Sequence, residues 1–238
     1  MVTFRLAPAL LRAGRRVYAI GDVHGLAGRL LALHAAIAAD LAARPCRAAL
    51  VVHLGDYLDR GPASAAVLAR LAAGDPVAGA ETVNLRGNHE ALALAVLNGG
   101  DEEAVALWRM NGAEPTLRSW GIDPASPHEG WAAQVPEAQL RFLRGLRVCH
   151  REDGYVFVHA GVRPGVALAA QDEEDFVWIR EPFLSYRGDF DAVVVHGHTP
   201  GKEPVVRANR IGLDTGAVYG GRLTAGILEE DRLGFLQA

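Results

Sequence analysis

The chain has 238 residues and a formal net charge of −4 at pH 7, and half of its residues are hydrophobic. This length is sufficient for one sizeable domain with an extensive core. The negative charge, without any block of Lys or Arg, excludes a nucleic-acid-binding surface, because that binding depends on neutralising phosphates. No apolar stretch approaches the roughly 20 residues that a membrane-spanning helix needs, so we expect no membrane partner.

The cysteines and the N-terminal segment bear on the cellular compartment. Cys46 and Cys149 lack the spacing of metal-binding or redox motifs, and isolated thiols are typical of a reducing compartment. In residues 1–16 a brief apolar run is broken by Pro8 and Arg12, and the basic residues follow that run. A secretory signal has the opposite order. We therefore expect a cytoplasmic protein and leave its oligomeric state open.

Five short apolar runs, rich in Val, Ile and Leu, predict buried strands. They cover residues 16–20, 49–54, 82–85, 155–159 and 192–196. A helix is predicted over residues 26–44, where apolar residues recur on one helical face before Pro45. A second helix is predicted from Pro62 to Ala73. Strands that alternate with helices are typical of an α/β sheet covered on both faces.

Residues 98–147 have a different pattern, without strand-like runs. Residues 102–110 and 137–146 have the periodicity of amphipathic helices, and a stretch rich in Gly, Pro and Ser separates them. A segment of this length cannot bury a core by itself. We interpret residues 98–147 as a helical insertion within a single domain of residues 1–238. The C-terminal residues 210–238 predict short strands joined by Gly turns.

Each of the five predicted strands is followed by a polar cluster. The clusters are GDVHG at 21–25, GDYLDRG at 55–61, RGNHE at 86–90, HAG at 159–161 and HGHT at 196–199. Taken singly, Gly-Asp is typical of a turn or helix cap, Asn of an Asx turn, and a lone His of a structural residue. In open α/β sheets, however, the carboxyl ends of the strands line a common crevice. The five clusters together therefore predict one site.

The residue types in these clusters favour a metal centre. Asp22 and His24 are two positions apart, so extended backbone places both side chains on one face. Asp56 has an oxygen for each of two ions, and a bridging carboxylate suits metals about 3.5–4 Å apart, as in two-metal phosphoester chemistry. N and O donors without thiolate suit Mn²⁺, Fe or Zn²⁺ better than Ca²⁺. The second ion would be completed by Asn88, His159 and one of His196 or His198.

The series GDVHG, GDYLDRG, LRGNHE, HAG and GHTP resembles the metallophosphoesterase superfamily and, within it, the bacterial and bacteriophage branch of the phosphoprotein phosphatases. The motifs span residues 21–200 in the family's order. GDYLDRG with LRGNHE is a specific pair, whereas GDVHG alone occurs across the superfamily. The resemblance implies a calcineurin-like α/β fold: a central β-sandwich of mixed sheets flanked by helices, in α/β/β/α layers, with a helical insertion.

The resemblance also implies a role for each matching residue. The ligands of the first ion would be Asp22, His24 and Asp56, and those of the second ion Asp56, Asn88, His159 and His198. His89 would protonate the leaving group and Asp59 would orient His89. Substrate phosphate would be bound by Arg60, Asn88, His89 and, as a weaker match, Arg180.

The last metal ligand is assigned by its place in the motif. His198 is preferred because it directly precedes Thr199 and Pro200, and His196 is kept in reserve because it could share the same face. Many relatives have a further His at the position of Pro200. The first ion is therefore expected to have fewer protein ligands and more water.

The implied activity is hydrolysis of phosphate esters by direct attack of a water that bridges two divalent cations. Mn²⁺ is placed first, with Fe or Zn²⁺ as alternatives, and the partner is a phosphorylated substrate, either a phosphoprotein or a small phosphoester. Asp59 beside Arg60, and Glu90 after His89, favour the serine/threonine protein phosphatase type. The alternative is a symmetrical bis(5'-nucleosyl)-tetraphosphate hydrolase, which shares the scaffold but usually lacks an acid at position 59 and has GNHD. A scaffold without turnover is disfavoured because all matched ligands are intact.

Several other residues are interpreted as structural. Histidines outside the clusters are expected to be core or solvated residues, and tryptophans to pack in the core or the insertion. The acidic run at 172–176 is expected to start a helix. The residues concerned are His34, His53, His128, His150, Trp108, Trp120, Trp131 and Trp178.

Overall fold

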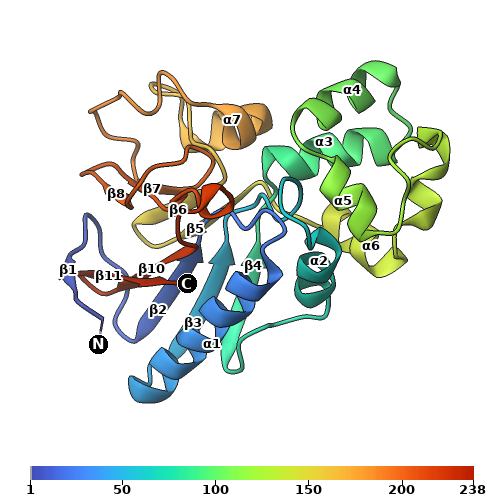
Figure 1. Cartoon of the computed structure of the whole chain (residues 1–238). Helices are drawn as coiled ribbons and strands as arrows, with labels where there is room; N and C mark the ends of the chain where they lie inside the picture. The colour runs from blue at the N-terminus through green and yellow to red at the C-terminus, as the bar shows by residue number, and fades with distance from the viewer. Residues whose placement is uncertain (1) are drawn as a thin grey trace.

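A computed structural model describes residues 2–238 as two stacked β-sheets with helices on their outer faces (Figure 1). The six-stranded sheet has the order β1-β11-β10-β2-β3-β4, and the five-stranded sheet has the order β5-β6-β7-β9-β8. The first sheet comprises β1 (Arg5–Leu6), β2 (Arg15–Ile20), β3 (Ala48–His53), β4 (Ala80–Asn84), β10 (Thr224–Glu229) and β11 (Arg232–Gln237). The second comprises β5 (Cys149–Glu152), β6 (Tyr155–Val158), β7 (Val193–His196), β8 (Val205–Val206) and β9 (Arg210–Gly212).

Three neighbouring strands of each sheet run parallel, β2, β3 and β4 in the first and β6, β7 and β9 in the second, which brings their carboxyl ends to one edge. In the first sheet β2 pairs with β3 and β3 with β4, so that Ile20, His53 and Asn84 lie side by side in register. In the second sheet β7 is parallel to both β6 and β9. The loops that leave these strands therefore start from a common level, which is the arrangement that a shared site requires.

The layers follow from the apolar faces of the sheets. One cluster lies between the two sheets and includes Val17, Leu50, Phe157 and Val195. Helices α1 (Ala27–Ala43) and α2 (Ser64–Ala72) cover the outer face of the first sheet, as Figure 1 shows for α1. Helix α7 (Glu173–Trp178) covers the second sheet. This confirms the expected α/β/β/α fold. The helices of the described chain include none with the length and apolar character that a membrane crossing requires.

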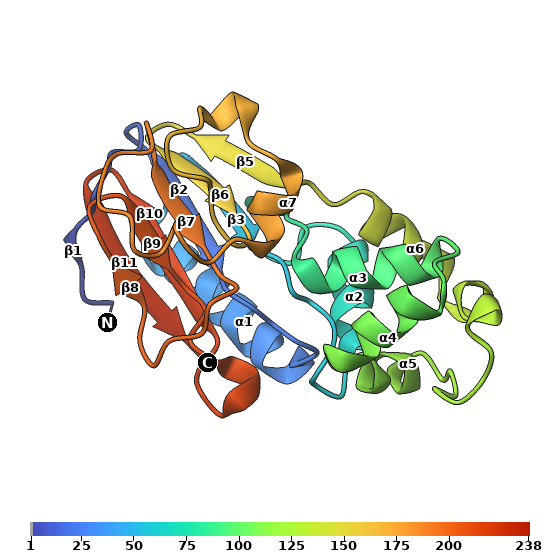
Figure 2. The ribbon, with the colours of Figure 1, turned by 90° about the horizontal axis from the view of Figure 1, so that it is seen from above.

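The alternation of strands and helices also predicted a sheet with helices on both faces. Instead, the inner face of β2, β3 and β4 packs on the second sheet, and the view from above shows β2 and β3 beside β6 and β7 (Figure 2). Two of the predicted strands, at 155–158 and 193–196 in the structure, belong to that second sheet. The sequence pattern predicts the strands but does not assign them to one sheet or two, because both arrangements bury the same apolar runs.

A group of helices extends from one side of the sandwich (Figures 1 and 2). It comprises α3 (Asn88–Leu97), α4 (Glu102–Met110), α5 (Glu114–Ser119) and α6 (Glu137–Arg144), with 3-10 turns at His128–Gly130 and Ala132–Gln134. Helices α4 and α6 agree with the predicted amphipathic segments. Helix α3 was not predicted, because eight of its ten residues are buried and apolar residues lie all around it, which leaves no amphipathic period. This group shares a core with α2, in which Leu68 and Trp108 are both buried.

His34 of α1 and His53 of β3 form a buried pair. Their Nε2 atoms are 2.8 Å apart, and Arg70 Nε donates to His34 Nδ1 at 2.8 Å. Because Arg has no acceptor, His34 carries its proton on Nε2 and donates it to His53, and both rings are neutral. Burial, followed by the charge of Arg70, lowers the pKa of His34 to about 4. Burial and the neighbouring His34 lower the pKa of His53 to about 3.

We expect this pair to make the protein less stable below pH 6.5. The folded-state pKa values of about 4 and 3 lie below the usual value for histidine, so the unfolded chain binds more protons as the pH falls from 6.5 towards 4. The free energy of unfolding should decline in this window, by up to roughly 1.4 kcal/mol per pH unit for each histidine. Urea unfolding at pH 7 and pH 5 measures the decline. A double variant, H34L/H53L, should show a shallower decline, and the same slope in both proteins would contradict the coupling.

Candidate active site

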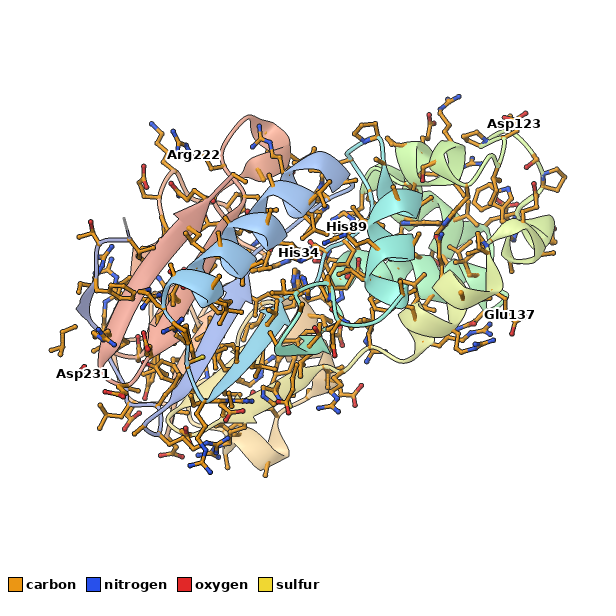
Figure 3. The ribbon with its side chains drawn as sticks, turned by 90° about the horizontal axis from the view of Figure 1, so that it is seen from below. His34, His89, Asp123, Glu137, Arg222 and Asp231 are labelled. Atoms are coloured by element: carbon orange, nitrogen blue, oxygen red, sulfur yellow. The ribbon has the colours of Figure 1, made fainter. Side chains whose placement is uncertain are left out.

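The loops after five strands meet at the edge where the two sheets and the helical group come together. Asp22 and His24 follow β2, Asp56 follows β3 and Asn88 begins α3 after β4. From the second sheet, His159 follows β6 and His198 follows β7. All six side chains are at most 5 % exposed. Figure 3 labels His89 of the same region near the middle of the molecule, whereas Glu137 of α6 lies at its outer side.

Asp56 lies at the centre of this group. Its Oδ2 is 3.5 Å from His24 Nε2, and its Oδ1 is 3.4 Å from His159 Nε2. The two carboxylate oxygens therefore face two different imidazoles. Asp56 also belongs to both groups of side chains whose ligand atoms lie within 4.8 Å of one another, one with His24 and His89 and the other with His159 and His198. This is the geometry that a carboxylate shared by two ions needs.

Asn88 joins the second group. Its Oδ1 lies 3.0 Å from His159 Nε2 and 3.0 Å from His198 Nδ1. Asp22 lies beside them, since both of its carboxylate oxygens accept from the His198 backbone N–H at 3.1 Å. The structure thus brings all six predicted ligands together.

The outer nitrogens of two imidazoles are held by backbone carbonyls. His24 Nδ1 lies 2.9 Å from the Leu58 carbonyl, and His159 Nδ1 lies 2.9 Å from the Leu54 carbonyl. Each ring therefore donates its Nδ1–H to a carbonyl and turns its Nε2 towards Asp56. Metal-binding histidines are commonly oriented by such contacts.

His196, the reserve ligand, lies away from the group. Its ring packs against Phe183 with a centroid distance of 5.0 Å, and its Nε2 is 3.3 Å from Arg210 Nη1. The expectation that His196 could share a face with His198 assumed extended backbone. It is wrong because the chain leaves the strand after His196, and His198 has a left-handed φ of 62°.

The electrostatics of the group fit divalent cations. Burial, with the nearby carboxylates of Asp214 and Asp56, raises the pKa of Asp22 well above its usual value. Burial alone would lower the pKa of His159, but the charge of Asp56 raises it to about 9. Both groups are thus exposed to the same concentration of buried negative charge. Carboxylate, imidazole and amide donors without thiolate suit Mn²⁺, Fe or Zn²⁺, so the residues fit two such ions. Asp214, which contributes to this charge, was not predicted.

His89 and Asp59 form a hydrogen-bonded pair beside Asp56. His89 Nδ1 is 2.7 Å from Asp59 Oδ2, and both side chains are fully buried. Burial lowers the pKa of His89, but the charge of Asp56 and the hydrogen bond that His89 donates to Asp59 raise it above its ordinary value. His89 Nε2 lies 3.9 Å from Asp56 Oδ2 and has no hydrogen-bond partner within residues 2–238. This nitrogen is available to a group that enters the site.

The two predicted phosphate-binding arginines differ in position. Arg60 Nη1 is 2.5 Å from His24 Nε2, so its guanidinium reaches the ligand group. Arg180 is exposed and lines a cavity of about 550 Å³ together with Trp178 and Arg163. Burial, the charge of His159 and the charge of Arg180 lower the pKa of His198, and the carboxylate of Asp56 opposes this shift. Arg180 therefore lies within electrostatic reach of the centre, at its solvent side.

The site concentrates strained backbone. Within the described chain, the non-glycine residues with positive φ include five of the site: His24, Asp56, Asp59, Arg60 and His198. Residues with a Cβ adopt this conformation only where the surroundings hold them. No sequence signal marks these positions, because the residue types are fixed by their chemistry.

Glu90 holds the loop that carries Asp56. Its carboxylate accepts from the backbone N–H groups of Asp56 at 2.8 Å, Tyr57 at 2.7 Å and Gly87 at 2.8 Å. It thereby ties the loop after β3 to the loop after β4. The sequence shows Glu90 only as a part of the family motif, because this role depends on backbone conformation.

Two further contacts were missed because they come from the helical group. Trp108 Nε1 donates to Asp59 Oδ2 at 2.8 Å, and Thr116 Oγ1 donates to Asp59 Oδ1 at 2.7 Å. The sequence predicts only a packing role for Trp108. A buried indole N–H requires an acceptor, but the 49 positions between Trp108 and Asp59 give no signal that identifies it.

Comparisons with known proteins agree with this geometry. A family model described as "Calcineurin-like phosphoesterase" matches residues 15–231. The chain belongs to the calcineurin-like phosphoesterase family. Serine/threonine-protein phosphatase 1 of Salmonella typhimurium is 31 % identical over 219 residues, which cover 88 % of this chain and 90 % of that protein. This member of the family also resembles bis(5'-nucleosyl)-tetraphosphatase PrpE [asymmetrical] of Anoxybacillus flavithermus, at 27 % identity over 226 residues and 87 % of both chains.

The solved structures show the same fold. A crystal structure titled as a putative diadenosine tetraphosphatase covers 96 % of this chain and 96 % of its own, with a TM-score of 0.66 and 22 % identity. This likeness concerns the fold alone.

Replacement of Gly87 should disrupt the centre through Asp56. A Cβ at Gly87 would lie 2.5 Å from the Asp56 backbone nitrogen and 2.8 Å from Glu90 Oε2, so the Asp56 loop would have to move. We expect G87A to retain at least about 10-fold less metal in competition with a chelator, because a ligand displaced by about 1 Å no longer fits the ion. Metal analysis after dialysis measures this. The control is G28A, where a Cβ meets nothing within 4 Å, and equal metal retention in the two variants would contradict the prediction.

Proposed function

We propose that the protein is a dinuclear-metal-dependent phosphomonoesterase of the serine/threonine protein phosphatase type. The proposed ligands are Asp22, His24, Asp56, Asn88, His159 and His198. When bound, two divalent cations acidify and orient a water for attack on phosphorus and neutralise charge on the phosphate oxygens. The rest of the chemistry belongs to side chains of this chain.

Arg60 and His89 would act on opposite ends of the reacting phosphate. Arg60 would pair with phosphate oxygens through its planar guanidinium. His89 carries one proton on Nδ1, directed to Asp59, and its raised pKa favours a second proton on Nε2. That proton would pass to the departing alkoxide oxygen, while Asp59 stabilises the ring. Arg180, at the solvent side, would be a second and weaker contact to the substrate phosphate.

The observation that carries the proposal is the pair of His89 and Asp59, 2.7 Å apart and fully buried beside the ligand group. Serine and threonine esters release an alkoxide, which is a poor leaving group without protonation. A dinucleoside polyphosphate releases a nucleotide phosphate, which leaves more readily. A dedicated acid therefore favours the phosphomonoesters. The resemblance to the Salmonella phosphatase supports the same choice.

Dinucleoside-tetraphosphate hydrolysis remains a second candidate because of Tyr219. Its side chain is 65 % exposed, and its ring centroid lies 5.7 Å from the guanidinium carbon of Arg60. Beside it is a cavity of about 350 Å³, which is also lined by Lys202 and Gly216. An exposed aromatic ring suits stacking of a nucleobase, and a lysine suits a second phosphate.

A substrate panel separates the two candidates. The wild-type protein, supplied with Mn²⁺, is assayed on a phosphoserine peptide, p-nitrophenyl phosphate and diadenosine tetraphosphate. We expect kcat/KM for the peptide to exceed that for the dinucleotide. Y219A should lower kcat/KM for the dinucleotide more than for p-nitrophenyl phosphate, by about 10-fold, because base stacking contributes about 1–3 kcal/mol. Turnover of the dinucleotide alone would overturn the phosphatase proposal.

A further inference from the structure

The helical group reaches the active site at the turn that carries Asp59 and Arg60. Both residues have left-handed backbone, with φ of 71° and 68°. Two consecutive residues with a Cβ keep this conformation only where neighbouring groups hold them. The turn between α4 and α5 provides one of these holding groups. The Arg60 N–H donates to the Gly112 carbonyl of this turn at 3.0 Å.

Thr116 of α5 bonds Asp59 at both its backbone and its side chain. The Asp59 N–H donates to Thr116 Oγ1 at 2.7 Å, and Thr116 Oγ1 donates to Asp59 Oδ1 at 2.7 Å. Ser64 Oγ lies 2.9 Å from Thr116 Oγ1. A hydroxyl has one proton to donate and two lone pairs. Since the proton goes to the carboxylate, the lone pairs accept from Asp59 and Ser64, and the full hydrogen-bonding capacity of Thr116 is used on this turn.

Trp108 of α4 bonds the other carboxylate oxygen. Its Nε1 donates to Asp59 Oδ2 at 2.8 Å, the same oxygen that lies 2.7 Å from His89 Nδ1. Trp108, Thr116, Asp59 and His89 are all fully buried. Water therefore does not compete for these hydrogen bonds. Two residues of the helical group thus set the orientation in which Asp59 meets His89.

We propose that Trp108 and Thr116 are positioning residues for His89, the acid that protonates the leaving group. The helical insertion of residues 98–147 would then contribute to catalysis. This rests on the role of His89 in the proposed function. Among the described residues, the side-chain hydrogen bonds of Trp108 and Thr116 go to Asp59 and Ser64 and not to His89, so each acts on His89 through Asp59. Without either donor, Asp59 would be free to rotate, and His89 Nε2 would no longer be aligned with the departing oxygen. A misaligned acid costs most when the leaving group is poor.

The test compares two esters that differ mainly in their leaving group, phenyl phosphate and p-nitrophenyl phosphate. p-Nitrophenolate departs with little help from an acid, whereas phenolate needs more. In W108F and T116V we expect kcat for phenyl phosphate to fall about 10- to 100-fold, and kcat for p-nitrophenyl phosphate to fall less than about 3-fold. KM for both esters should stay near the wild-type value. T116S keeps the hydroxyl and should restore the wild-type ratio of the two kcat values.

The matched control is W120F. Trp120 belongs to the same helical group and its Nε1 donates to Gln139 Oε1 at 2.7 Å, so W120F also removes an indole donor, but one directed at Gln139. We expect W120F to keep the wild-type ratio. An equal loss on both esters in W108F and T116V would overturn the proposal, because a purely structural role lowers both rates together. If T116V does not fold, W108F and T116S decide the outcome.

A second readout does not depend on turnover. The Nδ1–H proton of His89, bonded to a buried carboxylate, should give a downfield NMR resonance that is identified by its loss in H89N. We expect this resonance to shift in W108F and to stay unchanged in W120F. An unchanged resonance in W108F would overturn the positioning role. Failure of the wild-type protein to hydrolyse either ester would refute the proposed function, and the resonance would still decide the role of Trp108.

Discussion

The active-site geometry depends on the interaction between the buried carboxylate of Asp56 and the imidazoles around it. Burial by itself would raise the pKa of this carboxylate, but the imidazoles of His159, His89 and His24 hold that pKa well below its usual value. Asp56 is therefore a buried anion, and a buried anion needs opposite charge around it. His24 comes from the first sheet and His159 from the second, so Asp56 joins the two halves of the sandwich. In the proposed centre, two cations supply the remaining positive charge.

The β-sandwich makes this meeting of loops possible. Parallel pairing places Ile20, His53 and Asn84 at one level, so the loops after β2, β3 and β4 begin together. The second sheet stacks on the same strands and brings its own parallel ends opposite them. Glu90 then locks the loop of Asp56 to that of Gly87. Rigid strands thus carry strained loops, and the strain falls where the ligands must converge.

The convergence of the site residues was predictable from the sequence. A polar cluster after each buried strand predicted that Asp22, Asp56, Asn88 and His159 would lie together, because parallel strands share an edge. Other features carry no local signal. The distinction between His196 and His198 depends on a left-handed turn, which residue spacing does not reveal. Helix α3 lacks an amphipathic period. The hydrogen bonds from Trp108 and Thr116 to Asp59 join residues 49 and 57 positions apart, and only the packed tertiary structure brings them into contact.

The central claim is that two cations share the carboxylate of Asp56. The most direct test loads the chelator-treated protein with Mn²⁺ and then measures its metal content and its electron paramagnetic resonance spectrum. The proposed centre predicts two ions per chain with the multiline spectrum of a spin-coupled pair, since a bridge holds the ions about 3.5–4 Å apart. D56N should abolish the coupling. One ion per chain, or two ions with the spectrum of isolated Mn²⁺, would contradict a centre built around Asp56.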